Sequence, residues 1–214
     1  MSLSIGITRF LGTNCDEDVK NWIALIGHQP TYLWFEDQFN TKDFDLIIIP
    51  GGFSHGDYLR CGALAARTPV MKSVREFADK GNPILGICNG FQILCEAGLL
   101  PGVLLPNKNL RFIDNWQTLN VVNPINKFST KMNSKQQLKL PIAHGEGQYY
   151  ADSETLKKLS QNDQIWLTYQ NNPNGSVQNI AGITNDKHTI CGLMPHPERA
   201  LAEWMGSSDG GFFL

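Results

Sequence analysis

The segment Gly86-Ile87-Cys88-Asn89-Gly90 places a cysteine between two glycines, after an apolar run and before a helical stretch. Glycines on both sides of a nucleophile relieve crowding in a sharp strand-to-helix turn. The beginning of a helix stabilises a thiolate, and the N–H of Asn89 could donate to a developing oxyanion. An isolated cysteine is more often a small buried residue. The combination of strand, glycines and helix nevertheless favours Cys88 as a covalent nucleophile.

A nucleophilic thiol needs a base, and two histidine segments could supply one. In His196-Pro197-Glu198 the proline favours an extended backbone, in which residues two apart point to the same side. His55-Gly56-Asp57 has the same spacing, but its glycine leaves that pair less constrained. Spacing alone therefore favours His196 with Glu198 only slightly, and either pair could be an ordinary surface pair.

Two glycine-rich segments could complete a cleft. Gly51-Gly52 follows an apolar run, so its N–H groups could turn towards a substrate, although a plain tight turn explains it equally well. His144-Gly145-Glu146-Gly147 could contact a substrate or bend a hairpin. The Gly51-Gly52 segment lacks the G-x-G-x-x-G spacing, so we predict no dinucleotide site there.

Composition narrows the class of protein. The chain has 214 residues and a formal net charge of −2 without a Lys/Arg cluster, which predicts one domain over residues 1–214 and no nucleic-acid or membrane partner. The N-terminus does not resemble a signal peptide, and no apolar run is long enough to span a membrane. Five cysteines without a C-x-x-C pair indicate a reduced, cytoplasmic setting and no metal site. Those that lack the setting of Cys88 are Cys15, Cys61, Cys95 and Cys191, the last two expected in the core.

The elements that must position these residues follow an alternating pattern. Short apolar runs predict strands at Ser4–Thr8, Gln29–Trp34, Leu46–Ile49 and Ile84–Ile87, and helices are expected at Asp16–Ile26, Ala63–Asp79 and Asn89–Ala97. Later strands are expected at Leu119–Val122, Ile142–Tyr149, Ile165–Tyr169, Ile180–Thr184 and Ile190–Met194. The sequence therefore predicts an α/β fold: a mostly parallel sheet flanked by helices, with additional antiparallel strands. The pattern does not give the strand order.

Taken together, the motifs resemble the class I glutamine amidotransferases, and among them the separate glutaminase subunits of phosphoribosylformylglycinamidine synthases. The resemblance runs from the Gly12 loop to Gly210 and implies a flavodoxin-like sheet. The segments that carry it are Gly51-Gly52-Phe53-Ser54, Gly56-Asp57-Tyr58-Leu59-Arg60, Gly86-Ile87-Cys88-Asn89-Gly90-Phe91-Gln92, Ala143-His144-Gly145-Glu146-Gly147 and Met194-Pro195-His196-Pro197-Glu198-Arg199-Ala200.

The resemblance implies a role for each matching residue. Cys88 would be the nucleophile, His196 the acid and base, and Glu198 the residue that orients it. Oxyanion donors would be Gly52 and Asn89, and Gln92 would hold glutamine. The implied reaction converts glutamine to glutamate through a thioester and passes ammonia to a synthetase subunit, with which a small accessory subunit also assembles. The chain itself would need no cofactor, whereas ATP and Mg²⁺ would bind the synthetase.

Three alternatives remain open from the residues: a glutaminase serving another synthetase, a stand-alone cysteine hydrolase or peptidase, and a non-catalytic binding subunit. The last is disfavoured because all three triad residues are present. Two departures from the family pattern stand out. His55 occupies a position where relatives more often have an aromatic residue, which would place a second imidazole near the cleft. The sequence ends at Leu214, where relatives usually continue into a longer helix.

Overall fold

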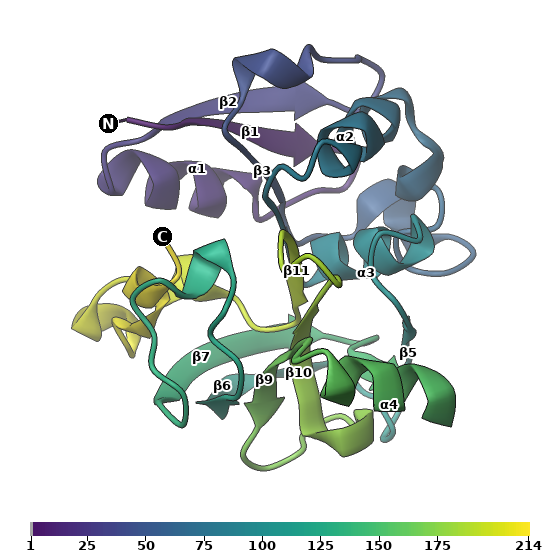
Figure 1. The fold of residues 1–214 in the computed structure, drawn as a ribbon, viewed down its shortest axis with the longest axis vertical. Coiled ribbons are helices and arrows are strands. Elements are labelled where there is room, and N and C mark those ends of the chain that lie inside the picture. Colours follow the sequence, from purple (N-terminus) through teal and green to yellow (C-terminus); the bar gives the residue numbers. More distant parts are fainter. Residues whose placement is uncertain (1) are drawn as a thin grey trace.

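The computed structural model describes residues 2–214, and its central feature is a nine-stranded sheet (Figure 1). Five neighbouring strands are parallel, in the order β2-β1-β3-β4-β11. This part has the strand order of flavodoxin-like sheets, which bind ligands beyond the carboxyl ends of their strands. The bounds of these strands are Ser4–Arg9 for β1, Gln29–Trp34 for β2, Leu46–Ile49 for β3, Ile84–Ile87 for β4 and Ile190–Leu193 for β11.

The sheet continues from β11 as an antiparallel region in the order β10-β9-β6-β7. The predicted fold class is therefore confirmed, with parallel strands in one half and antiparallel strands in the other. A separate two-stranded sheet pairs β5 with β8. The bounds are Val103–Leu105 for β5, Ile113–Val121 for β6, Gln137–His144 for β7, Gln148–Tyr150 for β8, Ile165–Tyr169 for β9 and Ile180–Thr184 for β10.

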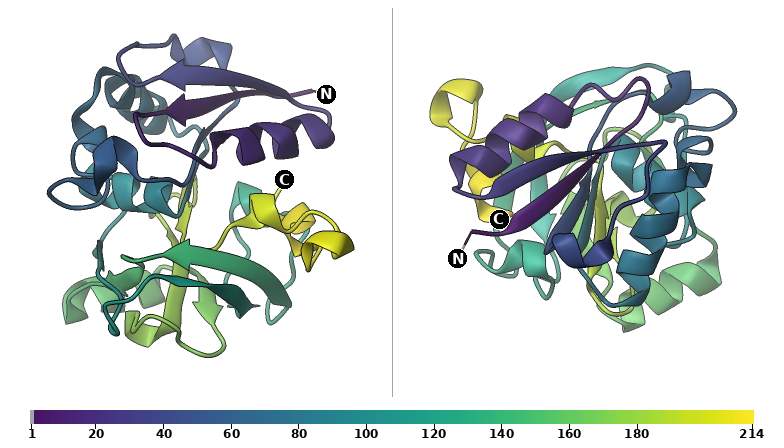
Figure 2. Two further views of the ribbon diagram at one scale, coloured as in Figure 1. Left: turned by 180° about the vertical axis from the view of Figure 1, so that it is seen from behind. Right: turned by 90° about the horizontal axis from the view of Figure 1, so that it is seen from above.

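Four α-helices accompany the sheets within residues 2–214: α1 (Asp16–Leu25), α2 (Pro69–Asp79), α3 (Asn89–Glu96) and α4 (Ser153–Gln161). Seen from above in Figure 2, α1 covers one face of the parallel strands and α2 the other. Strands β3 and β4 are consequently buried along their whole length, as expected for central parallel strands. No helix in this part of the chain has the length and apolar character needed to cross a membrane.

Several predicted elements need correction. The helix expected at Ala63–Asp79 begins only at Pro69, because Thr68 before the proline is extended, and a short 3₁₀ turn precedes it. The strand expected at Ile142–Tyr149 is two strands, since the chain turns after His144. Helix α4 and strand β5 were not predicted. For α4 a signal existed: the side chain of Asp152 caps the helix by accepting from the N–H of Thr155 at 2.7 Å.

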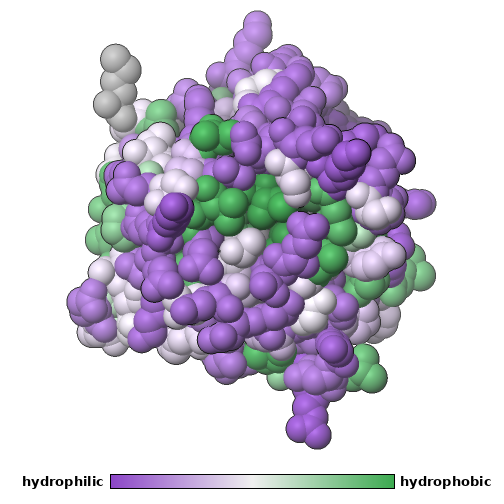
Figure 3. Space-filling view, turned by 60° about the horizontal axis from the view of Figure 1, so that its bottom comes forward, coloured by the Kyte–Doolittle hydropathy of each residue, from purple (hydrophilic) through white to green (hydrophobic). Residues whose placement is uncertain are grey.

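The face drawn in Figure 3 is largely hydrophilic, with a band of hydrophobic side chains across its middle. Apolar surface of this kind is normal in moderation on a globular protein. The core itself is continuous and runs through both halves of the sheet. The parallel and antiparallel regions therefore share one packed interior rather than two.

Candidate active site

Cys88 lies in the turn between β4 and α3, at the carboxyl edge of the parallel strands. Its φ of 51° and ψ of −106° are strained for a residue with a side chain, as expected of a nucleophile held in a sharp turn. A Cβ on Gly90 would lie 1.9 Å from the carbonyl oxygen of Ile49, and one on Gly86 would lie 2.7 Å from that of Gly90. Both glycines are therefore required for α3 to pack against the sheet.

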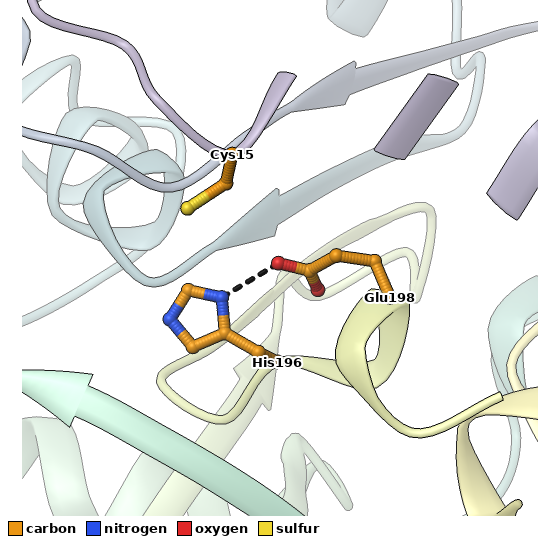
Figure 4. A group of neighbouring side chains, drawn as sticks. All are labelled: Cys15, His196 and Glu198. Atoms are coloured by element: carbon orange, nitrogen blue, oxygen red, sulfur yellow. Dashed lines mark hydrogen bonds and ion pairs between the residues drawn. The ribbon is translucent and has the colours of Figure 1, made fainter. Parts of the chain in front are cut away.

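His196 and Glu198 follow β11, which is the parallel neighbour of β4. Because Leu193 pairs with Ile87, the loop after β11 emerges beside Cys88. The His196 ring donates from Nδ1 to Oε1 of Glu198 at 2.6 Å, and both side chains are almost completely buried (Figure 4). Within residues 2–214, Nε2 has no hydrogen-bond partner, and the Cys88 thiol, whose charge acts on the ring, donates to the carbonyl of Ala143 at 3.8 Å.

The electrostatics of the pair suit proton transfer. Burial alone would lower the pKa of His196, but the Glu198 carboxylate, followed by the Cys88 thiol, raises this pKa well above its ordinary value. The carboxylate also fixes the tautomer with the proton on Nδ1, so that Nε2 is available to the thiol. The arrangement is a thiol, an imidazole and a carboxylate in series, as nucleophilic catalysis requires.

The competing pair His55 and Asp57 does not face one site. The His55 ring packs edge-on against Phe35 and Phe10, at centroid distances of 5.2 and 6.2 Å. Asp57, in contrast, lines a cavity beside Cys88. The two side chains diverge because His55, Gly56 and Asp57 all have positive φ, so the segment is not extended as the spacing argument assumed. The expected second imidazole near the cleft is accordingly packed among aromatic rings instead.

The cavity beside Cys88 has a volume of about 180 Å³, a size suited to a single small metabolite. Of the predicted site residues, Cys88, Gly52 and Gln92 line it. The opposite wall comes from the end of β7 and the turn after it, Ala143 to Glu146. The remaining lining residues are Phe53, Asp57, Cys61 and Phe112.

Gly52 is held by a neighbouring loop rather than by its own strand. The N–H of Phe53 donates to the carbonyl of Gly12 at 2.9 Å, and the N–H of Cys15 donates to that of Gly51 at 3.3 Å. Gly52 has a φ of 148°, and a Cβ on it would lie 2.8 Å from backbone atoms of Thr13 and of the residue after it. Only glycine fits here, so the backbone of this loop forms the cavity wall directly.

Asn89 and Gln92 join three segments through their side-chain amides. Asn89 Oδ1 accepts from the N–H of Ser54 at 3.2 Å, and its Nδ2 donates to Gln92 Oε1 at 2.8 Å. Gln92 Nε2 then donates to the carbonyl of Glu146 at 2.6 Å. The Asn89 side chain does not line the cavity, and its backbone N–H lies directly after Cys88 at the beginning of α3. This chain of bonds fixes the loop after β3, α3 and the turn after β7 relative to one another.

Two carboxyl groups, Asp57 and Glu146, give the cavity an acidic side around Cys61. Burial raises the pKa of Asp57. Burial, reinforced by the charge of Asp57, also raises the pKa of Cys61 far above its ordinary value, so this thiol stays protonated. Cys61 therefore lines the cavity without the activation that a nucleophile requires.

His144 is a second buried imidazole near the site. Burial, followed by the charge of His196, lowers its pKa to about 4. Its Nδ1 lies 3.0 Å from Oδ1 of Asn107, which also accepts from the N–H of Gly147. Asn107 thereby braces the turn that forms the cavity wall, with His144 neutral at pH 7.

Comparisons with known proteins agree with this geometry. A family model described as the CobB/CobQ-like glutamine amidotransferase domain matches residues 2–210. The chain belongs to this glutamine amidotransferase family. It is 50% identical to a phosphoribosylformylglycinamidine synthase subunit PurQ of Helicobacter hepaticus, over 99% of this chain and 96% of that protein. It is 51% identical to the PurQ subunit of Prochlorococcus marinus strain MIT 9312, over 100% of this chain and 96% of that protein.

Solved structures extend the comparison to three dimensions. A chain of the PurLQS structure from Thermotoga maritima superposes with a TM-score of 0.91 at 40% identity, covering 100% of this chain and 96% of that one. A putative GMP synthase protein from Thermoplasma acidophilum superposes with a TM-score of 0.62 at 14% identity, covering 99% and 94%. At that identity the second likeness concerns the fold alone. The glutamine amidotransferase fold is therefore present over the whole described chain.

In this glutamine amidotransferase, Cys15, to which the sequence assigned no role, lies beside His196 and Glu198. Cys15, just after β1, has its thiol within reach of the His196 ring and 3.2 Å from Nη2 of Arg199. Burial raises the pKa of this thiol. A signal existed, because Cys15 begins a helix after a parallel strand, as Cys88 does. Its proximity to a residue so distant in the sequence could not be inferred without the strand order.

Proposed function

We propose that this glutamine amidotransferase hydrolyses glutamine to glutamate and ammonia and supplies the ammonia to a synthetase subunit. The synthetase would use it to convert formylglycinamide ribonucleotide to formylglycinamidine ribonucleotide in purine biosynthesis. Identity of 50% and 51% over nearly full length to subunits of phosphoribosylformylglycinamidine synthase supports this assignment. The observation that carries the chemistry is the thiol turn after β4 beside the His196–Glu198 pair after its parallel neighbour β11.

In the proposed reaction, His196 Nε2 takes the proton of the Cys88 thiol, and the thiolate attacks the side-chain amide carbon of glutamine. The same proton passes from His196 to the departing ammonia as the carbon–nitrogen bond breaks, leaving a thioester. A water molecule, deprotonated by His196, then cleaves the thioester to glutamate and regenerates the thiol. Glu198 keeps the imidazole in the tautomer that both steps need.

Two tetrahedral oxyanions form along this path, and backbone N–H groups are suited to stabilise them. We assign this role to the N–H groups of Asn89, at the beginning of α3, and of Gly52, in the loop after β3. Gln92, which lines the same cavity and donates to the Glu146 carbonyl, is assigned to hold the substrate. The small volume of the cavity, which Phe53 and Phe112 help to line, favours a free amino acid over a peptide.

The assembly follows from the same assignment. The related Thermotoga maritima structure is a PurLQS structure, a name that joins three components. For this chain we propose two partners, a synthetase subunit and a small accessory subunit. ATP and Mg²⁺ are assigned to the synthetase and no cofactor to this chain. We further propose that residues 1–214 act as one glutamine amidotransferase domain and that the complex works in the cytoplasm.

The test is reconstitution with the synthetase and accessory subunits, measuring glutamate and the amidine product with glutamine or with ammonium chloride as nitrogen source. The wild-type complex should use both, and the Cys88→Ala complex only ammonium. That pattern separates loss of ammonia supply from loss of synthetase function. Glutamine hydrolysis without the amidine product would indicate another synthetase, and hydrolysis of peptides or esters without a partner would indicate a stand-alone hydrolase.

A further inference from the structure

Three side chains of different chemistry converge next to the cavity: Cys15, His196 and Glu198 (Figure 4). They come from the residue that precedes α1 and from the loop after β11. One ligand-type atom from each, the thiol sulphur, an imidazole nitrogen and a carboxylate oxygen, lies within 4.8 Å of the other two. All three residues are buried. The proposed mechanism uses His196 and Glu198 but gives Cys15 no part.

We propose that Cys15, His196 and Glu198 form an inhibitory site for a thiophilic divalent cation, with Zn²⁺ as the reference ion. Thiolate, imidazole and carboxylate are the ligands that Zn²⁺ takes in proteins, at about 2.3 Å for sulphur and about 2.0 Å for nitrogen or oxygen. Around one ion such ligands lie roughly 3.3–3.8 Å apart, by the geometry of a tetrahedron. Small side-chain movements would therefore close the observed group around an ion.

The cluster also contains polar atoms that the chain leaves without partners. Both Nε2 of His196 and Oε2 of Glu198 are buried and make no hydrogen bond within the described residues. Buried polar atoms are normally satisfied by hydrogen bonds or by coordination. Oε2 of Glu198 is thus a free ligand atom in the cluster, whereas the free Nε2 of His196 lies across the ring from Nδ1, the nitrogen that contacts Glu198. A cation at Nδ1 would replace the proton that this nitrogen donates to Glu198, and that proton would move to Nε2, which has no hydrogen-bond partner among the described residues.

Charge balance supports the same conclusion. A Cys15 thiolate and the Glu198 carboxylate would neutralise a divalent cation, with the thiol proton released to solvent. Arg199, which donates to the Cys15 sulphur at 3.2 Å, is itself paired with Asp18 at 3.0 Å. Its positive charge is therefore compensated, and its N–H remains placed to support a ligating sulphur from the outer side, as outer-shell donors do in metal sites.

The consequence for catalysis rests on the proposed function. A cation held by His196 and Glu198 removes the base and the residue that orients it, while Cys88 remains untouched. Inhibition would then run through Cys15 and not through the nucleophile. This feature distinguishes the site from the simpler possibility that a metal ion bridges Cys88 and His196.

Binding is tested first without any need for activity. In the full-length Cys88→Ala protein, Zn²⁺ affinity is measured by competition with a chromophoric chelator, and Co²⁺ is added to look for thiolate-to-metal charge transfer in the near ultraviolet. We expect one equivalent to bind with a charge-transfer band. Adding Cys15→Ser should weaken binding at least a hundredfold and abolish the band. Adding Cys61→Ser, the matched control for the other thiol near acidic groups, should change neither.

Loss of binding in Cys88→Ala alone would overturn the proposal in favour of a Cys88–His196 site, as would a persistent band after Cys15→Ser. Should Cys15→Ser prove unstable, Glu198→Gln in the Cys88→Ala background removes a second ligand and should weaken binding at least tenfold. The activity arm then compares glutaminase inhibition by Zn²⁺, reversed by a chelator, in complexes of the wild type and of Cys15→Ser assembled with the synthetase and accessory subunits. The variant should need at least tenfold more Zn²⁺, and equal sensitivity would contradict inhibition through Cys15. Absence of glutaminase activity in all proteins would count against the proposed function but leave the binding result standing.

Discussion

The two halves of the sheet contribute different things to the site. The parallel half delivers chemical groups at the ends of adjacent strands, with Cys88 after β4 and the His196–Glu198 pair after β11. The antiparallel half delivers a wall, the turn after β7, whose backbone and side chains face the thiol across the cavity. One half is thus suited to bond making, and the other to holding what is transformed.

The difference has a geometric origin. Parallel strands bring all their carboxyl ends to one edge, so short loops from distant parts of the sequence meet there. Antiparallel strands alternate direction, and here β7 reaches the same edge with its carboxyl end and a glycine-rich turn. If this division of roles is right, changes in the parallel half should reduce turnover. Changes in the antiparallel half should act on stability and binding.

The largest expected effect is at the nucleophile. Cys88→Ala should reduce glutamine hydrolysis by at least about 10⁴-fold, because no other group can form the thioester. The matched control is Cys95→Ala in the same helix, which should keep its activity apart from a stability cost of about 1 kcal/mol. Labelling with an electrophilic glutamine analogue, followed by peptide mapping, locates the reactive thiol. Labelling of Cys61 or Cys15 with an active Cys88→Ala protein would contradict this assignment.

The next effect separates the base from the residue that orients it. His196→Ala should lower kcat by about 10³-fold or more, since it removes both proton transfers. Glu198→Gln should lower kcat by less, because an amide oxygen can still accept from Nδ1 without stabilising the imidazolium. Steady-state kinetics on both variants at saturating glutamine gives the comparison. A larger loss for Glu198→Gln than for His196→Ala would be incompatible with these roles.

In the wall formed after β7, the expected effect is on stability. His144 has a pKa of about 4 in the folded protein, below its ordinary value, so between about pH 6.5 and pH 4 the unfolded chain binds a proton that the folded chain does not. Its contribution is therefore present above about pH 6.5 and is lost as the pH falls through this range, by at most about 3 kcal/mol. Urea unfolding at several pH values should show a shallower decline for His144→Gln, and an unchanged slope would rule out this histidine as the cause.

A smaller effect concerns the Gly51-Gly52 loop, which follows β3 in the parallel half. A glycine-rich oxyanion loop can change backbone orientation at low cost, and one lost donor costs roughly 3 kcal/mol, or about a hundredfold in rate. We therefore expect low glutaminase activity for the chain alone, rising at least tenfold on assembly with the synthetase and its nucleotide substrate. Glutamate release with and without the assembled partners is the measurement. Full activity of the free chain, unchanged by partners, would exclude this coupling.

The sequence predicted the parallel half better than the antiparallel half, for a physical reason. Strands such as Leu46–Ile49 and Ile84–Ile87 are apolar on both faces, so their runs are continuous and their bounds are clear. The solvent-facing strand β6 begins at Ile113, six residues before its apolar stretch, because its first half is polar. Local motifs offered Cys88 and two histidine pairs, and the family resemblance chose between the pairs. The proximity of Cys15 to His196 depends on strand order, which no local pattern contains.

The smallest expected effect is at His55, and it tests the choice between the two histidine pairs. His55→Phe should change kcat by no more than about twofold, because the ring packs against Phe10 and Phe35 and does not line the cavity. The substitution removes a buried Nε2 that has no hydrogen-bond partner, which should stabilise the variant. It also places a bulkier residue at a φ of 53°, which should destabilise the variant. We expect the free energy of unfolding to change by less than about 1 kcal/mol.

Asp57→Asn is the matched variant, because Asp57 belongs to the same i, i+2 pair but lines the cavity. It should raise KM for glutamine severalfold with a smaller effect on kcat, since it alters the wall and not the reacting groups. A kcat loss at His55→Phe comparable to that at His196→Ala would reverse the assignment of the base. An equally large kcat loss at Asp57→Asn would show that the loop after β3 also contributes a reacting group, in addition to the loops after β4 and β11. The contrast between the two variants therefore tests whether proximity to the thiol, rather than spacing in the sequence, decides which residues act.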